Sequence, residues 1–263
     1  MDTNKIAKEA KTIELKSPNK NLFFLIHGYS GSPTDFNGLG NYLHKRFNAN
    51  VKIMRLIGHG TKISDLDKLN YDDFLDDAEK ELRKEIAKGM NIVIGGLSSG
   101  SLMAFDLAAR YPVKGILSAS AAYKFKFPLN IIRFIAPIIP IKYIKKPITN
   151  FEKRSRAGSF NYLYVHLRGF KAISQGKRRL RNLMKDVVVP CVFVHSKGEN
   201  IIDYKSDKLI KGKISSKKTK NIVFSPKRER EHNLFYSPYH KKIYRILGDF
   251  VEENNLLGST LAI

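Results

Sequence analysis

NIVIGGLSSGSLMAFDLAAR, residues 91–110, runs from an apolar strand into a helix through one tight turn. The turn places Ser98 between two glycines, Gly96 and Gly100. Small residues at both positions let a strand-to-helix turn close while the serine projects at the carboxyl end of the strand. An ordinary glycine-rich turn is the alternative, but the strand before it and the helix after it favour a βα unit with Ser98 as candidate nucleophile.

Similar apolar runs recur on both sides of this unit, and stretches with helical spacing separate them. Such alternation with short links indicates βαβ units. Continuous apolar strands are typical of a parallel sheet that helices cover on both faces. The expected strands are 22–26, 51–56, 91–95, 115–119, 187–195 and 221–224, with 12–15 as an antiparallel edge strand, and the expected helices include 33–46, 71–87, 102–110 and 238–252.

The composition allows a large hydrophobic core. Of the 263 residues, 43% are hydrophobic, which excludes a disordered chain. A single cysteine excludes an internal disulfide and a cysteine-based zinc site. The lysine-rich start of the chain has no apolar core of a signal peptide, and no run of 18 apolar residues predicts a membrane span. We therefore expect a cytoplasmic protein.

The net charge of +23 is unevenly distributed. Residues 122–186 hold 16 basic and two acidic residues, a net charge of +14, and they interrupt the strand–helix rhythm. We therefore expect a core formed by residues 1–121 and 187–263, with 122–186 as an inserted basic segment. Such charge suits an anionic membrane or nucleic acid, but no nucleic-acid-binding module is recognisable, so a nucleic-acid partner is not expected.

A nucleophilic serine needs an oxyanion hole and a base. The segment His27-Gly28-Tyr29 follows the strand at 22–26, so a backbone N–H at this point faces Ser98 across the sheet edge. The expected oxyanion hole is the N–H of Tyr29 with the N–H of Ser99. His27 is interpreted as a histidine that holds the loop.

Two loops near the C-terminus supply the candidate base and acid. When the chain order is nucleophile, acid, base, the base comes last. This order selects His232, which lies between the last strand and the last helix, over His240 inside that helix. The acid is expected after the fifth strand, where Glu199 lies four residues past its end. Asp203 is the alternative, although it also suits the N-cap of a helix that begins near Tyr204.

Four segments together carry a resemblance to a known superfamily. They read FFLIHGYSGSPTDF (23–36), RLIGHGT (55–61), GGLSSGSLMAFDLAARYP (95–112) and VPCVFVHSKGENIID (189–203). With them the chain resembles the α/β-hydrolases, and within these the bacterial carboxylesterases and monoacylglycerol lipases. The resemblance implies an α/β-hydrolase fold, with a mostly parallel sheet and helices on both faces. It also implies that 122–186 forms a cap, or lid, over the active site.

The resemblance also assigns roles to single residues. It implies Ser98 as nucleophile, Glu199 as acid and His232 as base, with Tyr29 and Ser99 as oxyanion donors. Glu199 departs from the group, which usually has Asp at this position. His59, in a Gly58-His59-Gly60 loop common near the site, joins His27 and Gly28 as candidate substrate-pocket residues. No metal-binding or dinucleotide motif is present, so neither a metal nor a cofactor is expected.

These features predict a serine hydrolase that cleaves carboxylic esters through an acyl-enzyme. One alternative is a monoacylglycerol lipase or lysophospholipase that works at a membrane surface, because the inserted segment combines apolar residues with cations suited to anionic headgroups. The same segment also fits a plain solvated basic face. A third possibility is a catalytically silent binding protein with this fold. The expected partner is a small-molecule or lipid ester, with peripheral membrane contact through the cap as a further expectation.

Overall fold

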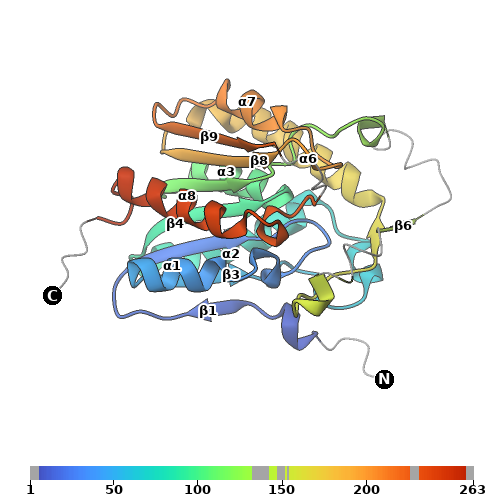
Figure 1. The fold of residues 1–263 in the computed structure, drawn as a ribbon, viewed down its shortest axis with the longest axis horizontal. Helices are drawn as coiled ribbons and strands as arrows, with labels where there is room; N and C mark the ends of the chain where they lie inside the picture. The colour runs from blue at the N-terminus through green and yellow to red at the C-terminus, as the bar shows by residue number, and fades with distance from the viewer. Residues whose placement is uncertain (1–5, 132–141, 147–151, 153, 226–230, 259–263) are drawn as a thin grey trace.

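A seven-stranded sheet forms the centre of the computed structural model (Figure 1), which describes residues 6–131, 142–146, 152, 154–225 and 231–258. The strand order is β1-β3-β2-β4-β5-β8-β9, and neighbouring strands are parallel except β1 and β3. The predicted antiparallel edge strand is therefore confirmed. The strands are β1 (Ile13–Leu15), β2 (Asn21–Ile26), β3 (Asn50–Met54), β4 (Asn91–Leu97), β5 (Gly115–Ala119), β8 (Cys191–Ser196) and β9 (Thr219–Phe224).

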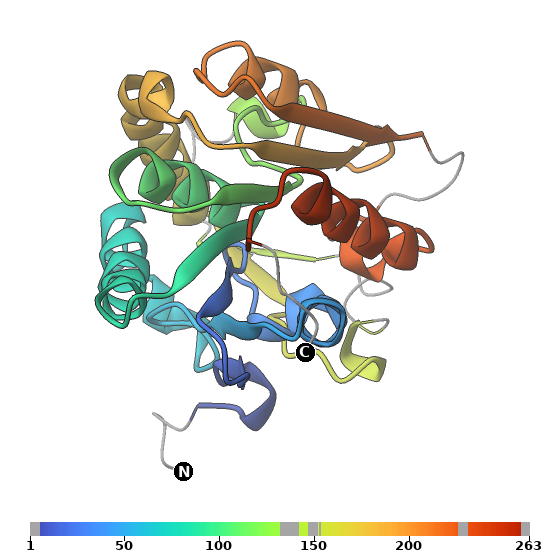
Figure 2. The same ribbon diagram turned by 90° about the vertical axis from the view of Figure 1, so that its left-hand side faces the viewer.

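Helices cover both faces of the sheet, as expected. In Figure 2, α1 (Leu39–Phe47) and α8 (His240–Glu253) lie on one side of the sheet. On the other side lie α2 (Tyr71–Ala87), α3 (Ser99–Arg110) and α6 (Arg168–Leu183). Two hydrophobic cores result, because successive strand side chains point to opposite faces. Further helical segments include α7 (Lys205–Lys211), η1 (Lys8–Ala10), η2 (Pro33–Phe36), η3 (Ile63–Leu66), η4 (Met184–Asp186) and η5 (Leu234–Tyr236).

Several expected elements have different bounds, and two of them differ most. β8 begins at Cys191 rather than at residue 187, since Pro190 has no N–H to donate and Val188 is 65% exposed. The helix expected over 33–46 is divided into η2 and α1, because Asn37 and Gly38 between them adopt left-handed backbone angles.

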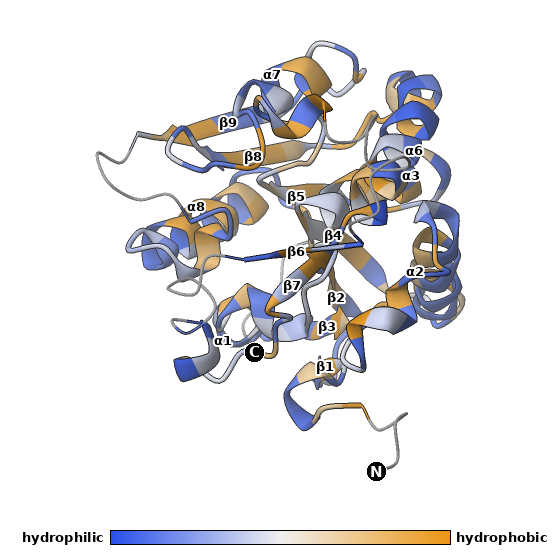
Figure 3. Cartoon of the chain, turned by 90° about the vertical axis from the view of Figure 1, so that its right-hand side faces the viewer, coloured by the Kyte–Doolittle hydropathy of each residue, from blue (hydrophilic) through white to orange (hydrophobic). Residues whose placement is uncertain are grey.

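The inserted basic segment contributes a hairpin and a helix. β6 (Tyr143–Lys145) pairs with β7 (Tyr164–His166) in an antiparallel ladder, in front of the sheet in Figure 3. α6 packs on α2 and α3, and its Ile173 and Leu180 belong to the hydrophobic core on that side. Residues 132–141, 147–151 and 153 of the inserted basic segment lie outside the described residues. In the part of the chain that is described, no helix is both long and apolar enough to cross a bilayer.

Candidate active site

The turn between β4 and α3 holds Ser98 in a strained conformation. Its φ of 58° and ψ of −118° lie in a region that non-glycine residues rarely adopt. A Cβ on Gly96 would lie 2.2 Å from the carbonyl carbon of Gly100, and one on Gly100 would lie 2.1 Å from the Ile26 oxygen. Both positions therefore require glycine, and this close packing fixes the turn against β2. Strain of this kind concentrates at functional sites.

The two candidate oxyanion donors lie beside Ser98. The backbone N–H of Tyr29 donates to the Ser99 hydroxyl at 2.7 Å, which ties the loop after β2 to the first turn of α3. Gly28 approaches so closely that a Cβ there would lie 3.2 Å from the Ser98 Cβ. The structure thus brings the loop after β2 and the first turn of α3 together. The Tyr29 N–H is already hydrogen-bonded to the Ser99 side chain.

The histidines of the loops after β2 and β3 are buried. His27 Nε2 accepts from the Leu56 N–H, and His59 Nε2 accepts from the Ser30 N–H, both at 3.1 Å. Burial lowers the pKa of His27 to about 4 and also lowers the pKa of His59, so both imidazoles are neutral at pH 7. Neither side chain lines the cavity described below, whereas Gly28 does. Their hydrogen bonds order the two loops, and a role of His27 and His59 in the substrate pocket stays a prediction.

Glu199 and His232 are in direct contact. Glu199 Oε2 accepts a hydrogen bond from His232 Nδ1, although 33 residues separate them in sequence. Burial alone would raise the pKa of Glu199, but the neighbouring His232 and His195 lower it below its usual value. An ionised carboxylate only accepts hydrogen bonds, so the proton is on Nδ1 and the His232 Nε2 lone pair is free to act as a base.

Asp203, the alternative acid, has other partners. Its carboxylate pairs with Lys124 Nζ at 2.9 Å and accepts from the Lys205 N–H at 2.9 Å. The latter bond lies at the start of α7, whose N-cap residue is Tyr204. Between the two candidate acids, the contact with His232 belongs to Glu199.

The loop that carries His232 is fixed by hydrogen bonds on both sides of the imidazole. The Ser120 hydroxyl donates to the His232 carbonyl at 3.2 Å, and the Asn233 amide donates to the Asp35 carbonyl at 2.9 Å. Among the described residues, the Ser98 hydroxyl makes no hydrogen bond to His232. In the absence of substrate such bonds are often long and shorten when the substrate binds.

Ser98 and His232 line one cavity of about 320 Å³. Its apolar wall comes from the inserted segment and the loop before α7, and its polar end lies beside the His232 loop. The residues that line it include Phe125, Leu129, Ile144, Val165, Phe170, Ile173 and Ile201 on the apolar side, and Asp35, Lys146, Arg154, Asn161, Glu231 and Asn233 on the polar side.

The polar end contains charges that the sequence did not single out. Arg154 forms an ion pair with Asp35. Lys146 Nζ donates to the Ser30 carbonyl at 3.4 Å, and burial lowers the pKa of Lys146 to about 8. Both cations belong to the inserted segment, so its excess of basic residues was the only sequence signal for them.

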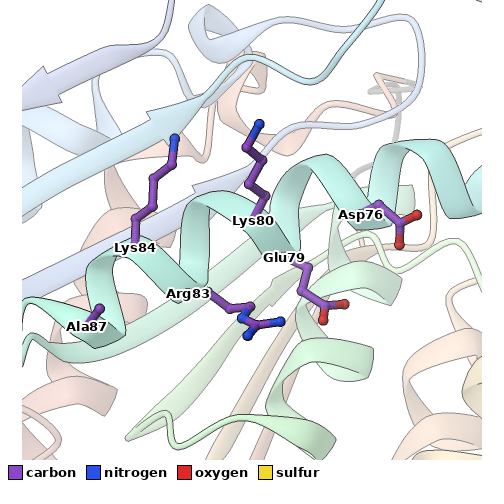
Figure 4. A pocket seen from close by; sticks show the side chains of 6 residues that line it. All are labelled: Asp76, Glu79, Lys80, Arg83, Lys84 and Ala87. Carbon is purple, nitrogen blue, oxygen red and sulfur yellow. The ribbon is translucent and has the colours of Figure 1, made fainter.

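A second pocket runs along α2 (Figure 4) and is unrelated to this chemistry. Five of its six lining side chains are charged, and none of them belongs to the site: Asp76, Glu79, Lys80, Arg83, Lys84 and Ala87. Over the described ranges, no group of three or more metal-binding side chains occurs.

Comparisons with known proteins agree with this architecture. The profile of the family described as "Serine aminopeptidase, S33" matches residues 17–235. A thermostable monoacylglycerol lipase from Bacillus sp. (strain H-257) is 28% identical over 99 residues. That alignment covers 37% of this chain and only 39% of the relative.

Solved structures resemble nearly the whole chain. A structure from work on LipS and LipT, two metagenome-derived lipolytic enzymes, has a TM-score of 0.78 at 17% identity, over 95% of this chain and 100% of that one. A soluble variant of monoglyceride lipase from Saccharomyces cerevisiae, in complex with a substrate analog, has a TM-score of 0.72 at 15% identity. That match covers 98% of this chain and 97% of the other. At these identities the likeness concerns the fold.

Proposed function

Because this chain belongs to the Serine aminopeptidase S33 family of α/β-hydrolases, we propose that it is a serine hydrolase that cleaves carboxylic esters. One observation carries the proposal: a buried carboxylate, Glu199, holds the proton-bearing Nδ1 of His232, and His232 shares a cavity with Ser98 on its strained turn. Together these residues make a nucleophile, a base and an orienting acid.

The reaction proceeds through an acyl-enzyme. His232 Nε2 takes the proton of Ser98 as its Oγ attacks the ester carbonyl, and Glu199 stabilises the imidazolium that forms. The N–H groups of Tyr29 and Ser99 hold the oxyanion. The imidazolium returns its proton to the departing alcohol, which leaves the acyl group on Ser98. Water, deprotonated by His232, then attacks the acyl-enzyme, and the acid leaves as Ser98 regains its proton.

The cavity favours an ester with an apolar acyl group of short to medium length. Its apolar wall includes Phe125, Val165 and Phe170, and its volume of about 320 Å³ is at the small end of ligand pockets. An aminopeptidase would need a carboxylate for the substrate's α-ammonium group. The two acidic residues that line the cavity have protein partners, since Asp35 pairs with Arg154 and Glu231 accepts from the Asn233 N–H.

Residues 122–186 are proposed as the cap over this site. In support, Ile144 of β6 and Val165 of β7 line the same cavity as Ser98. α6 of the same segment also packs into the core, so this cap would be anchored on α2 and α3.

A monoacylglycerol lipase is the second candidate, and two buried polar atoms favour it. Arg154 Nε and Asn161 Oδ1 have no hydrogen-bond partner among the described residues, and both side chains belong to the polar end of the cavity. A buried donor and a buried acceptor left unpaired are costly, so a hydroxyl-bearing leaving group such as glycerol would suit them. Exposed apolar residues of the same segment, Phe127 and Ile144, would suit contact with a lipid surface.

A fluorescent fluorophosphonate and a p-nitrophenyl ester series test the proposal. Wild type and the exposed-serine control Ser64→Ala should label and turn over esters, whereas Ser98→Ala should do neither. The chain-length optimum separates short-chain esterase from lipase activity, and faster turnover on monoacylglycerol micelles would select the second candidate. A folded wild type that is not labelled and hydrolyses neither an ester nor an aminoacyl p-nitroanilide would contradict the proposal. The chain would then be a catalytically silent binding protein.

A further inference from the structure

Glu199 has a second imidazole on the side away from His232. Its Oε1 lies 2.6 Å from His195 Nε2, and His195 Nδ1 lies 3.1 Å from Asp207 Oδ1. The side chains of His195, Glu199 and Asp207 are at most 1% exposed. A continuous buried chain of hydrogen bonds therefore runs from His232 through Glu199 and His195 to Asp207.

Three successive elements of the chain supply this network. His195 is the penultimate residue of β8, Glu199 follows in the loop, and Asp207 lies in α7. Glu199 accepts three hydrogen bonds, because Oε1 faces His195 while Oε2 takes both His232 Nδ1 and the Ile202 N–H at 3.1 Å. The carboxylate is thereby fixed on both sides.

The charges in this network alternate. Burial alone would discharge His195, but its hydrogen bonds to Asp207 and Glu199 raise its pKa to about 9. At pH 7 it is therefore an imidazolium that donates from both nitrogens. Glu199 and Asp207 are the charged groups that act on it among the described residues, and its neighbour across the ladder, Val223 of β9, is uncharged. The carboxylates of Glu199 and Asp207 together with the His195 imidazolium have a net charge of −1. This net negative charge stabilises the imidazolium that forms at His232 during the reaction.

We propose that His195 and Asp207 are positioning residues for the active site: His195 holds Glu199 ionised and aligned with His232, and Asp207 holds His195. This inference rests on the proposed hydrolase function. It also accounts for glutamate at a position where related enzymes usually have aspartate, since the additional methylene lets one carboxylate contact two imidazoles.

The test is the pH dependence of kcat and KM for a p-nitrophenyl ester in wild type, His195→Gln and Asp207→Asn. Loss of the cation beside Glu199 favours protonation of the base, so the acidic limb of kcat/KM in His195→Gln should move to higher pH by about half a unit or more. Its kcat should fall by about ten- to a hundredfold while KM changes by less than about threefold. In the wild type, kcat should decline as His195 loses its proton near pH 9. In Asp207→Asn this decline should begin at lower pH, because His195 then keeps its proton less well.

Imidazole ¹⁵N NMR supplies a readout that does not depend on turnover. Both nitrogens of His195 should carry protons at pH 7.5 in the wild type, and Asp207→Asn should lower the pH at which one is lost. A neutral His195 at pH 7.5, or an active His195→Gln with unchanged kcat and acidic limb, overturns the inference. If His195→Gln fails to fold, Asp207→Asn and the NMR measurement decide. An inactive wild type would instead contradict the hydrolase function itself.

Discussion

The backbone N–H of Tyr29 is bonded to the side-chain oxygen of Ser99, and these two residues are the proposed oxyanion donors. The bond joins the loop after β2 to the start of α3 before any substrate is present. In the proposed reaction the oxyanion must share or displace this bond.

Replacement of Ser99 by alanine tests what that hydroxyl does. Both backbone donors remain in Ser99→Ala, but the loop loses its connection to α3. We expect kcat for a p-nitrophenyl ester to fall by about three- to tenfold with KM nearly constant, well below the 10²- to 10³-fold loss that removal of a donor causes. A higher kcat would show instead that the hydroxyl competes with the oxyanion.

Substitutions of the two candidate acids distinguish their roles. Glu199→Gln keeps the shape of the side chain but removes its charge, and we expect kcat to fall by about 10³- to 10⁴-fold. In Glu199→Asp the shorter side chain should lose one of its two imidazole contacts, and kcat should fall by at least about tenfold. Asp203→Asn is a matched control at the start of α7, and its kcat should stay within about threefold of the wild-type value. A larger loss for Asp203→Asn than for Glu199→Gln would reverse the assignment.

The glycine at the start of α3 has a measurable structural role. A methyl group at Gly100 would lie 2.1 Å from the Ile26 oxygen, so Gly100→Ala must displace backbone. We expect about 3 kcal/mol lower free energy of unfolding in urea. Gly212→Ala is the control, because its Cβ meets only the Lys208 oxygen at 3.4 Å, and it should change stability by less than about 0.5 kcal/mol. Equal stability of the two variants would contradict the close packing at the turn.

The buried network makes stability depend on pH from both sides. Because the pKa of Glu199 is lowered from 4.5, its contribution to the free energy of unfolding is present above pH 4.5 and is lost at more acidic pH. Because the pKa of His195 is raised from 6.5 to about 9, its contribution is full below pH 6.5 and is lost as pH rises through 9. Urea unfolding at pH 6 and pH 10 should differ by up to about 3 kcal/mol. His195→Gln should remove most of this alkaline loss, and an unchanged difference would mean that other groups cause it.

The polar end of the cavity yields a prediction about the leaving group. Asn161→Leu removes the buried acceptor while it keeps the volume of the side chain. If a glycerol hydroxyl donates to that acceptor, kcat/KM for a monoacylglycerol should fall about tenfold. The p-nitrophenyl ester of the same fatty acid has no such hydroxyl, so its kcat/KM should stay within about twofold. Parallel losses on both substrates would place Asn161 outside leaving-group recognition.

The fold could be predicted from local sequence patterns because its central strands are buried on both faces. β2 reads NLFFLI and is buried along its whole length. Its apolar run therefore predicted a parallel strand that is covered on both faces. Element ends were less accurate, as at Asn37, where a left-handed residue interrupts helical spacing. Such conformations depend on a single residue and leave the hydrophobic pattern unchanged.

Only part of the candidate site could be predicted from the sequence. Ser98 stood out because its flanking glycines are a local requirement of the turn. The pairing of His195 with Asp207 joins a strand to a helix, and its only trace in the sequence was a histidine four residues before Glu199. His27 and His59 are buried and hold their loops by hydrogen bonds, so their expected place in the substrate pocket stays a prediction. The roles of Ser98, Glu199 and His232 stay predictions until the variants are assayed.

The position of β9 at the sheet edge has a consequence for how the site would fail on warming. β9 pairs only with β8, and His232 lies beyond its end, whereas Ser98 follows β4 in the middle of the sheet. Edge strands open locally at lower free energy than central ones. The base can therefore separate from the nucleophile while most of the sheet is intact, so heat inactivation would precede global melting. Amide hydrogen exchange in β9, rather than the melting temperature, would then report the working lifetime of the protein.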